Sequence, residues 1–250
     1  MVIAAQVPAL TTPDAVEPEP SYARYAVYYA PEPGSPLACF GRTWFGYDAE
    51  AGVAVANRQD YGLGADFVAR ITETPRHYGL HATLRAPFRL APGVREEELI
   101  EAFAAFAATR PAVSLGEVGL NRIGPFLALT PLAGTQDVDR LHAQCVFAFE
   151  RFRAPLTAEE RERRLAQGLT ANQRILLAQW GYPFVLSEYR FHITLTGRLT
   201  ADESERITPV LVPALKDLQG ETLRIGALCL FAEPADGGPF RLVSRVALTG

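Results

Sequence analysis

Two four-residue motifs hold the residue types from which an acid–base site can be built. They read His-Ala-Thr-Leu from His81 and His-Ile-Thr-Leu from His192, and they contain two of the four histidines in the chain. Imidazole titrates near neutral pH, so one ring can take a proton while a second, protonated ring gives one. The hydroxyls of Thr83 and Thr194 can donate hydrogen bonds to phosphoryl oxygens. The set therefore predicts phosphodiester cleavage, with both proton transfers carried by imidazoles and no metal required.

Both motifs are interpreted as β-strands, and this interpretation positions their side chains. Because side chains alternate between the two faces of a strand, His81 and Thr83 point the same way, while the apolar residues of the motif face a core. The same alternation groups His192 with Thr194. If the two strands face one cleft, two imidazoles and two hydroxyls meet there.

The other two histidines serve as a comparison. His77 falls in a predicted surface loop, and His142 falls in a predicted helix, where a structural role is expected. A metal site on His81 and His192 would need carboxylate or cysteine ligands at a recognisable spacing, which the sequence does not offer. We therefore expect no metal and no other cofactor. One such motif alone would be a weak signal, and its repetition is what gives it weight.

Each motif strand is followed by the same predicted elements, a helix and then two strands. This weak duplication predicts an α+β fold of two similar lobes with pseudo-two-fold symmetry, in which antiparallel sheets line a central cleft and helices lie outside. The predicted ranges are 79–88 (strand), 95–110 (helix), 112–120 and 125–132 (strands) in the first half, then 188–199 (strand), 200–218 (helix), 222–234 and 240–249 (hairpin) in the second.

The composition is that of an ordinary soluble protein. The 250 residues are 48% hydrophobic, and the formal net charge of −4 argues against extended nucleic acid as a partner. Three widely spaced cysteines indicate neither a disulfide framework nor a zinc knuckle, which favours a cytoplasmic protein. No apolar run approaches the ~20 residues of a membrane span, so no membrane partner is expected. Residues 1–22 are predicted to be a flexible tail without signal-peptide features, and residues 23–250 a single bilobal domain.

Several residues near the motifs are candidates for substrate binding. An arginine on the motif face can bind a second phosphate group, and a tyrosine can stack on a sugar or a base. Strand-end arginines are otherwise solvated or paired, and tyrosines otherwise pack in the core. The candidates are Arg85 and Tyr78 beside the first motif, Arg190, Thr196 and Arg198 on the face of His192, and Tyr25.

At these residues the chain resembles the 2H phosphoesterase superfamily, which is named for two H-x-[ST]-x motifs. Longer phrases resemble one branch of it, whose proteins are assigned to phosphonate metabolism and long catalogued as a domain of unknown function. The similarity covers nearly everything from Arg24 onward. The phrases are RYAVYYAPEPGSPL, FGRTWFGYDAEAG, RHYGLHATLRAPFRL, FRAPLT, WGYPFVLSEYRFHITLTGRL and RLVSRVALTG.

The resemblance implies a two-lobed fold with a concave cleft and a metal-independent cyclic phosphodiesterase. His81 and His192 would be the acid–base pair, and Thr83 and Thr194 would hold the phosphate oxygens. For this branch, association with carbon–phosphorus bond cleavage points to a ribose cyclic phosphate, a small phosphorylated substrate. Two alternatives stay open: an enzyme that processes RNA ends, and a non-catalytic binder of phosphorylated ligands. The oligomeric state and the role of segment 154–182, a lid or a buttress, are also open.

Overall fold

The computed structural model describes residues 22–56, 58–216 and 222–250, so the predicted tail lies outside the described residues except for Tyr22, which begins a strand. Helices and strands alternate irregularly along the chain. The helices are α1 (Pro36–Phe45), α2 (Ala65–Arg76), α3 (Glu96–Ala107), α4 (Gln136–Phe149), α5 (Ala158–Leu165), α6 (Ala171–Trp180) and α7 (Ala201–Ala214). The strands are β1 (Tyr22–Tyr29), β2 (Tyr47–Asp48), β3 (Val53–Ala54), β4 (Ala82–Phe88), β5 (Val113–Gly116), β6 (Val118–Ile123), β7 (Phe126–Pro131), β8 (Ile193–Thr194), β9 (Leu223–Ile225), β10 (Ala227–Pro234) and β11 (Arg241–Ala247).

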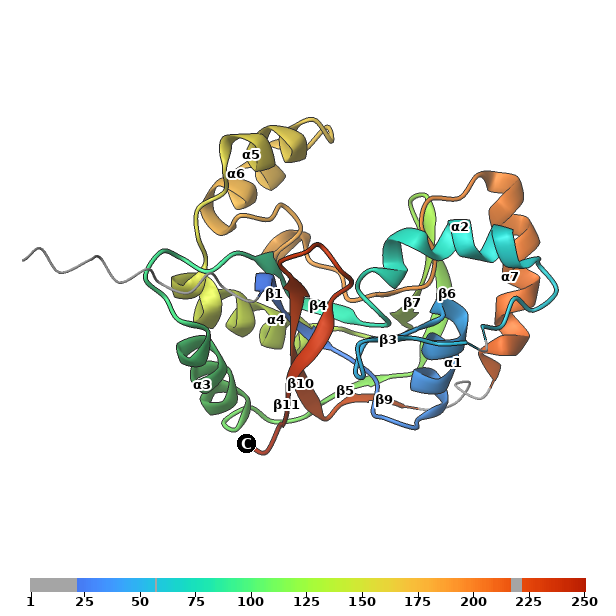
Figure 1. The fold of residues 1–250 in the computed structure, drawn as a ribbon, viewed down its shortest axis with the longest axis horizontal. Helices are drawn as coiled ribbons and strands as arrows, with labels where there is room; N and C mark the ends of the chain where they lie inside the picture. The colour runs from blue at the N-terminus through green and yellow to red at the C-terminus, as the bar shows by residue number, and fades with distance from the viewer. Residues whose placement is uncertain (1–21, 57, 217–221) are drawn as a thin grey trace, which may run out of the picture.

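One seven-stranded antiparallel sheet runs through the centre of the molecule in the order β11-β10-β1-β4-β8-β7-β6 (Figure 1). Two short two-stranded sheets, β2-β3 and β5-β9, accompany it. The helices α3 and α4 lie toward the β11 side, and α1, α2 and α7 lie toward the β6 side. The α+β class with antiparallel strands is therefore as predicted from the sequence.

The arrangement of the two lobes differs from the one we expected from consecutive halves of the chain. The hairpin β6-β7 follows the first motif in sequence, yet it pairs with β8, which carries the second motif. The hairpin β10-β11 follows the second motif, yet it pairs with β1, the neighbour of β4. The halves thus exchange hairpins, and because β4 pairs with β8 the sheet is continuous rather than split in two.

Most helix ends follow their sequence signals. Ser35 caps α1, accepting a hydrogen bond from the backbone N–H of Ala38, and Pro36 occupies the first turn. Capping boxes open α5 at Thr157 and α7 at Thr200, as their S/T-x-x-E patterns predict. Gly181 ends α6 with a left-handed backbone, φ 71°, which glycine adopts without a steric cost.

The strand predicted over residues 188–199 is much shorter, because β8 contains only Ile193 and Thr194. A 3-10 turn, Leu186–Glu188, precedes it. After it, the backbone N–H of Leu195 still donates to the Leu127 carbonyl of β7, and the N–H of Gly197 donates to the carbonyl of Ile71 in α2 at 2.6 Å. The regular strand is therefore short, and irregular backbone contacts continue after it.

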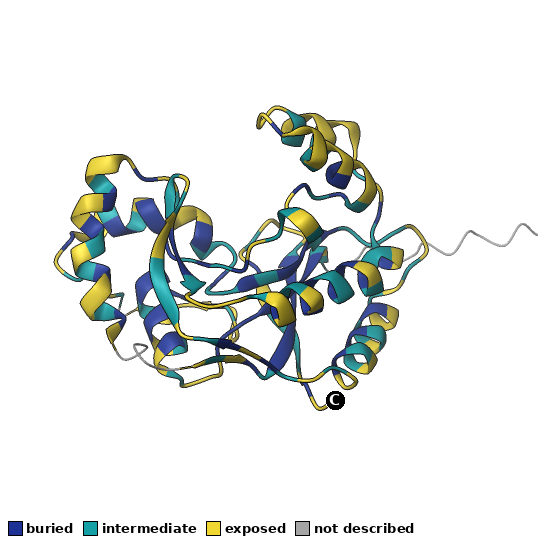
Figure 2. Ribbon diagram, turned by 180° about the vertical axis from the view of Figure 1, so that it is seen from behind, coloured by how far each residue is buried: buried dark blue, intermediate teal, exposed yellow. Residues whose placement is uncertain are grey.

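Helices α5 and α6 form a projection that stands beside the sheet. Figure 2 shows it as the most exposed part of the fold, and α5 buries none of its residues. A small apolar cluster of Val146, Leu176 and Val185 attaches α6 to α4. The segment 154–182, whose role the sequence left open, contains this projection. None of the described helices is long and apolar enough to cross a membrane.

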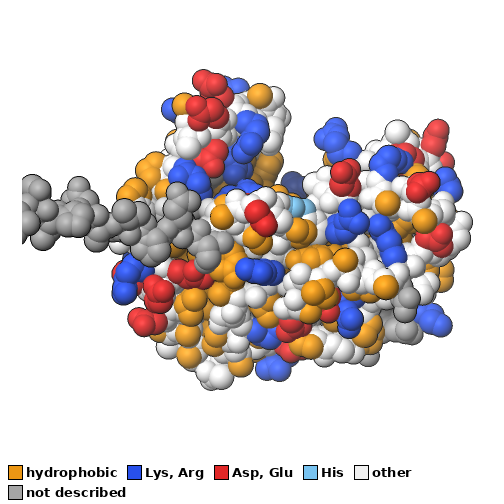
Figure 3. All heavy atoms as spheres, in the orientation of Figure 1, with side chains coloured by type: hydrophobic (Ala, Val, Ile, Leu, Met, Phe, Trp, Pro, Cys, Tyr) orange, Lys and Arg blue, Asp and Glu red, His pale blue; other side chains and the backbone are white. Residues whose placement is uncertain are grey.

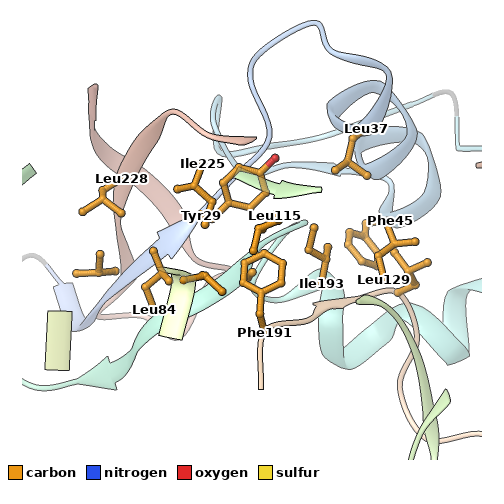
Figure 4. Packing of buried hydrophobic residues seen from close by; sticks show 14 of the residues in the cluster. Tyr29, Leu37, Phe45, Leu84, Leu115, Leu129, Phe191, Ile193, Ile225 and Leu228 are labelled. Carbon is orange, nitrogen blue, oxygen red and sulfur yellow. The ribbon is translucent and has the colours of Figure 1, made fainter. Parts of the chain in front are cut away.

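The core lies on the face of the sheet opposite the motif histidines. Ala82 and Leu84 of the first motif and Ile193 and Leu195 of the second are fully buried there, as strand alternation predicts. Figure 4 shows Leu84 and Ile193 in this packing layer. Burying a side chain of this size contributes ~1.5–3 kcal/mol, so these apolar residues hold both motifs firmly. Trp44 of α1 adds a hydrogen bond from its indole N–H to the Leu195 carbonyl, 2.7 Å.

Candidate active site

The structure brings the two motifs together on adjacent strands. Ala82 lies opposite Ile193 in the antiparallel register, and continuing that register sets His81 opposite Thr194 and Thr83 opposite His192. The two histidines are thus diagonal neighbours, a relation that separates β-carbons by ~7–8 Å or somewhat less. The two imidazoles are close enough to influence each other's charge, since His192 contributes to lowering the pKa of His81.

Each imidazole is oriented by the same local contact. The Nδ1–H of His81 donates to the carbonyl of Gly79 at 3.0 Å, and the Nδ1–H of His192 donates to the carbonyl of Arg190 at 2.8 Å. In both motifs the acceptor is the carbonyl two residues earlier. This bond fixes the neutral tautomer and leaves Nε2 of each ring for a substrate. Nε2 is then a base when the ring is neutral and an acid when the ring is protonated.

Aromatic rings support the two histidines unequally. Tyr28, opposite Thr83 on β1 and only 1% exposed, stacks on His81 with ring centroids 4.0 Å apart and planes at 30°. Tyr78 lies 5.9 Å from the same ring. His192 has Phe126 of β7 at 5.8 Å. The stack holds the His81 ring more closely than the single tilted contact holds His192.

Burial lowers the pKa of both catalytic candidates. The pKa of His81 is lowered to about 4, mainly because burial removes solvent; the Gly79 carbonyl opposes this shift, and the nearby His192 adds a smaller lowering. Burial also lowers the pKa of His192 from its ordinary value of 6.5, opposed by the Arg190 carbonyl. Both rings are therefore neutral at neutral pH in the free protein. An anionic ligand beside them would raise both pKa values, because it stabilises the charged form.

A cavity of about 420 Å³ opens over the motif strands. Thr83 and His192 line it directly, and His81 and Thr194 lie beside them in the register described above. Figure 3 shows the hollow between the α5–α6 projection and the opposite lobe, with a histidine at its floor. Its walls come from β4, β6, β7, α4, α6 and the segment after α6: Ala86, Ile123, Phe126, His142, Gln173, Tyr182, Phe184, Val185, Glu188, Tyr189 and Arg190.

Two accessory candidates from the sequence lie near the pair. Arg190 is exposed at the cavity wall, and its carbonyl orients His192. Tyr78 is partly buried next to His81, packed on Phe240 with centroids 5.1 Å apart. Arg190 thus lines the cavity itself, whereas Tyr78 lies behind His81 and is not among the lining residues.

Four accessory candidates are placed elsewhere. Tyr25 is fully buried in the core on the other face of the sheet, because strand alternation assigns Tyr28 to the motif face. Thr196 is fully buried, and its hydroxyl accepts from the backbone N–H of Leu127 at 3.0 Å. Arg198 is exposed and does not line the cavity, since the strand ends before it. Arg85 is buried, binds Glu150, and lines a neighbouring pocket.

His142 and His77 have the structural surroundings expected of them. His142 is buried, donates from Nδ1 to the Leu84 carbonyl at 2.8 Å, and accepts the Leu186 backbone N–H at Nε2. Both ring nitrogens are thus occupied, and the pKa of His142 is lowered by burial to about 4. His77 is partly exposed and pairs with Glu233 at 2.9 Å. Within residues 22–56, 58–216 and 222–250, no three His, Cys, Asp or Glu side chains gather as metal ligands.

Sequence reasoning did not foresee the stacking of Tyr28 on His81, nor the contributions of Phe126 and Tyr182 to the site. The signal for Tyr28 is present, since strand alternation separates it from Tyr25, but the sequence does not say which face of β1 meets the motifs. Phe126 and Tyr182 depend on long-range packing of β7 and of the segment after α6. No local pattern marks either of them.

Two His-x-Thr segments on adjacent strands therefore bring two histidines and two threonines together on one face of the sheet. The chain belongs to the family described as "Protein of unknown function (DUF1045)", which matches residues 83–241. That match begins at Thr83 and includes the whole second motif. The family is the domain of unknown function that the sequence resemblance implied.

Two curated relatives share more than a third of their aligned residues with the chain. Both are named ribose 1,5-bisphosphate phosphokinase PhnN. The one from Janthinobacterium sp. (strain Marseille) is 36% identical over 92% of this chain, and the one from Laribacter hongkongensis (strain HLHK9) is 37% identical over 90%. In each case the chain spans about half of the relative, 52% of its length.

Solved structures of low sequence identity also match over most of the chain. E. coli LigT complexed with NADP+ has a TM-score of 0.43 at 15% identity and covers 92% of this chain and 100% of its own. TT0787 of Thermus thermophilus has a TM-score of 0.42 at 13% identity, covering 91% and 98%.

Proposed function

We propose that the protein is a metal-independent cyclic phosphodiesterase that opens a cyclic phosphate ester of a small sugar phosphate or nucleotide. The observation that carries the proposal is the paired geometry of the motifs. His81 and His192 lie on adjacent strands, each anchored through Nδ1 and each with Nε2 left for a substrate. Thr83 and Thr194 lie across from them as hydroxyl donors.

The proposed reaction follows from this arrangement. The neutral ring of one histidine takes a proton from water as the water oxygen forms a bond to phosphorus. The second histidine, protonated, gives its Nε2 proton to the ester oxygen as the bond from that oxygen to phosphorus breaks. The hydroxyls of Thr83 and Thr194 stabilise the charge that develops on the non-bridging oxygens. The product is a ring-opened phosphate monoester, and the two histidines have exchanged protonation states.

The pKa directions support a division of roles. His81 has the strongly lowered pKa, about 4, so it stays neutral and suits the base. Burial also lowers the pKa of His192, but this ring lines the cavity, where a bound phosphate would lie beside it, so it suits the acid. The substrate phosphate would raise the pKa of His192 on binding and supply the protonated ring.

The substrate class is proposed from chemistry and from the relatives together. The cavity of about 420 Å³ suits a small molecule rather than a nucleic-acid strand. The curated relatives bear the name of a kinase for ribose 1,5-bisphosphate, a phosphorylated ribose. We therefore favour a ribose cyclic phosphate, in agreement with the phosphonate metabolism that the sequence resemblance implies.

The test is a ring-opening assay with a chelator present. Purified protein is incubated with nucleoside 2′,3′-cyclic phosphates and with 5-phosphoribosyl 1,2-cyclic phosphate, and the monoester product is quantified. We expect turnover that survives the chelator and falls at least ~100-fold in His81→Ala and in His192→Ala. The control is Arg140→Ala, on the exposed side of α4, which should retain full activity.

Other outcomes would point to the alternatives. Turnover that disappears with chelator and returns with added metal would overturn the two-histidine mechanism. Cleavage confined to oligonucleotide ends would favour RNA-end processing, and tight binding without turnover would favour a non-catalytic binder of phosphorylated ligands.

A further inference from the structure

We propose that a second phosphate-binding pocket lies next to the histidine cavity and selects cyclic phosphates that carry an additional phosphomonoester. This inference rests on the proposed function and names its substrate class. We call the feature the arginine pocket. It is lined by arginines from β1, β4, the residue after β4, the segment before α5, and α5 itself: Arg24, Arg85, Arg89, Arg153, Arg163 and Arg164.

The arginine pocket has more positive than negative charge. Glu150 is shared between Arg85 and Arg153, both at 2.5 Å. Glu160 pairs with Arg89, and Glu233 pairs with Arg24. Among the described residues, Arg163 and Arg164 have no carboxylate within ion-pair distance, so the six guanidinium groups are balanced by these three carboxylates. An anion with two negative charges would offset most of the remainder.

Two of these arginines have buried nitrogens without a hydrogen-bond partner. Arg85 is 1% exposed, and although its Nη2 donates to Glu150, its Nε and Nη1 have no acceptor. Arg164 lies over the Tyr182 ring at 5.2 Å, and its Nε also lacks an acceptor. A buried donor without an acceptor costs ~1–3 kcal/mol, and more when charged. Phosphate oxygens accept from the guanidinium fork in pairs, so this ligand would satisfy several of these donors at once.

The arginine pocket adjoins the histidine cavity. Ala86 and Tyr182 line both of them. Thr83 of the motif and Arg85 are two residues apart on β4, which separates their positions along the strand by ~7 Å. A single five-carbon sugar that carries one phosphate at each end spans a distance of this order. One molecule can therefore place its cyclic phosphate at the histidines and its second phosphate at the arginines.

The arginine pocket is narrow, with a volume of about 20 Å³. This is room for little more than one water molecule, so a phosphate enters only if side chains move apart. The movable side is α5, which buries none of its residues and carries the exposed Arg163. Arg85 and Arg153, held by Glu150, form the fixed side. Ligand binding should thus move α5 away from Arg85 and Arg153, a consequence that hydrogen exchange across α5 can detect.

The experiment compares two substrates that differ only in the second phosphate, 5-phosphoribosyl 1,2-cyclic phosphate and ribose 1,2-cyclic phosphate. Each is tested with the wild type and with Arg164→Gln and Arg163→Gln. We expect KM for the phosphorylated substrate to rise at least tenfold in Arg164→Gln with kcat little changed, and less in Arg163→Gln. KM for ribose 1,2-cyclic phosphate should not change. The matched control is Arg161→Gln, exposed on the same helix and not part of the arginine pocket.

A binding measurement separates failure of this inference from failure of the proposed function. Ribose 1,5-bisphosphate and ribose 1-phosphate are titrated calorimetrically into the wild type and Arg164→Gln, with melting temperatures recorded for both. Preference for the bisphosphate that Arg164→Gln abolishes supports the arginine pocket even when no cyclic phosphate is turned over. Equal kcat/KM for the two cyclic substrates, or an equal loss for both in Arg164→Gln, would overturn the pocket and leave the histidine mechanism intact.

Discussion

The two motifs share a four-residue frame but lie in different surroundings. His81 directly precedes a seven-residue strand, stacked under Tyr28, with the aromatic ring of Tyr78 nearby. His192 directly precedes a two-residue strand, with Phe126 as its ring contact and the exposed Arg190 beside it. The duplicated frame sets the orientation of each ring through Nδ1, while the surroundings set how strongly its pKa is lowered. Equivalent residues can in this way serve as base and acid.

The largest expected effect comes from removing either histidine in a way that retains its polar character. We expect His81→Gln and His192→Gln each to lower kcat at least ~100-fold, because each ring carries one of two coupled proton transfers. The double variant should be little worse than either single variant, since the two act as a unit. Steady-state kinetics with a cyclic phosphate measures this. A single variant with near wild-type kcat would remove that histidine from the mechanism.

The two threonines should have smaller and similar effects. Thr83→Val and Thr194→Val each remove one hydroxyl donor to the phosphoryl oxygens while keeping the side-chain shape. We expect each to lower kcat by ~10–100-fold, with KM changed less, because the contact strengthens as charge develops. Steady-state kinetics on both variants checks this. Thr83 lines the cavity and Thr194 does not, so a larger loss for Thr83→Val would sharpen the contrast between the strands.

The pH dependence of kcat/KM reports the two histidines in the free protein. As pH falls through about 4, His81 becomes protonated and the base is lost. As pH rises through the pKa of His192, which lies below 6.5, the acid is lost. We expect a bell-shaped profile with its maximum on the acid side of pH 6.5, each limb changing by up to ~10-fold per pH unit. A maximum above pH 7.5 would contradict the division of roles.

The smallest effects should come from the aromatic contacts. Tyr28→Leu removes the stack on His81 and should lower kcat by ~10-fold, because a displaced ring no longer aligns with phosphorus. Tyr28→Phe keeps the stack and is the matched control. Phe126→Leu, beside His192, should cost only a few-fold. Kinetics on the three variants, with circular dichroism to verify folding, tests whether His81 is the more tightly held ring. A greater loss in Phe126→Leu than in Tyr28→Leu would reverse that order.

Local signals in the sequence predicted the first motif strand, the central residues of the second, and the faces of the apolar residues, and they also explain the helix caps. Ser35, Thr157 and Thr200 cap helices because their side chains bond to backbone only three residues away. Ala82 and Ile193 are buried because strand alternation is also local. The four motif residues could be singled out from sequence for the same reason, since each pair lies within one short extended segment.

What the sequence could not supply depends on contacts between distant segments. Thr196 is buried with its hydroxyl accepting from the Leu127 backbone N–H, and Arg198 is exposed away from the cavity; both positions depend on how the chain packs after β8. Arg85 is near the first motif, but its partner Glu150 is 65 residues further along the chain. The exchange of hairpins cannot be predicted from the sequence either. Local patterns would be satisfied equally well if each hairpin paired next to the motif strand that precedes it in the chain.

The exchange of hairpins has a consequence for the order in which the protein folds. Strand β1, which carries Tyr28, gains its outer neighbours only from β10 and β11, and these are synthesised after both motifs. Strands that are as far apart in sequence as β1 and β10 pair late and slowly during folding. Neither half of the chain can therefore complete the site alone. A nascent chain cannot form the whole site until β10 and β11 have left the ribosome.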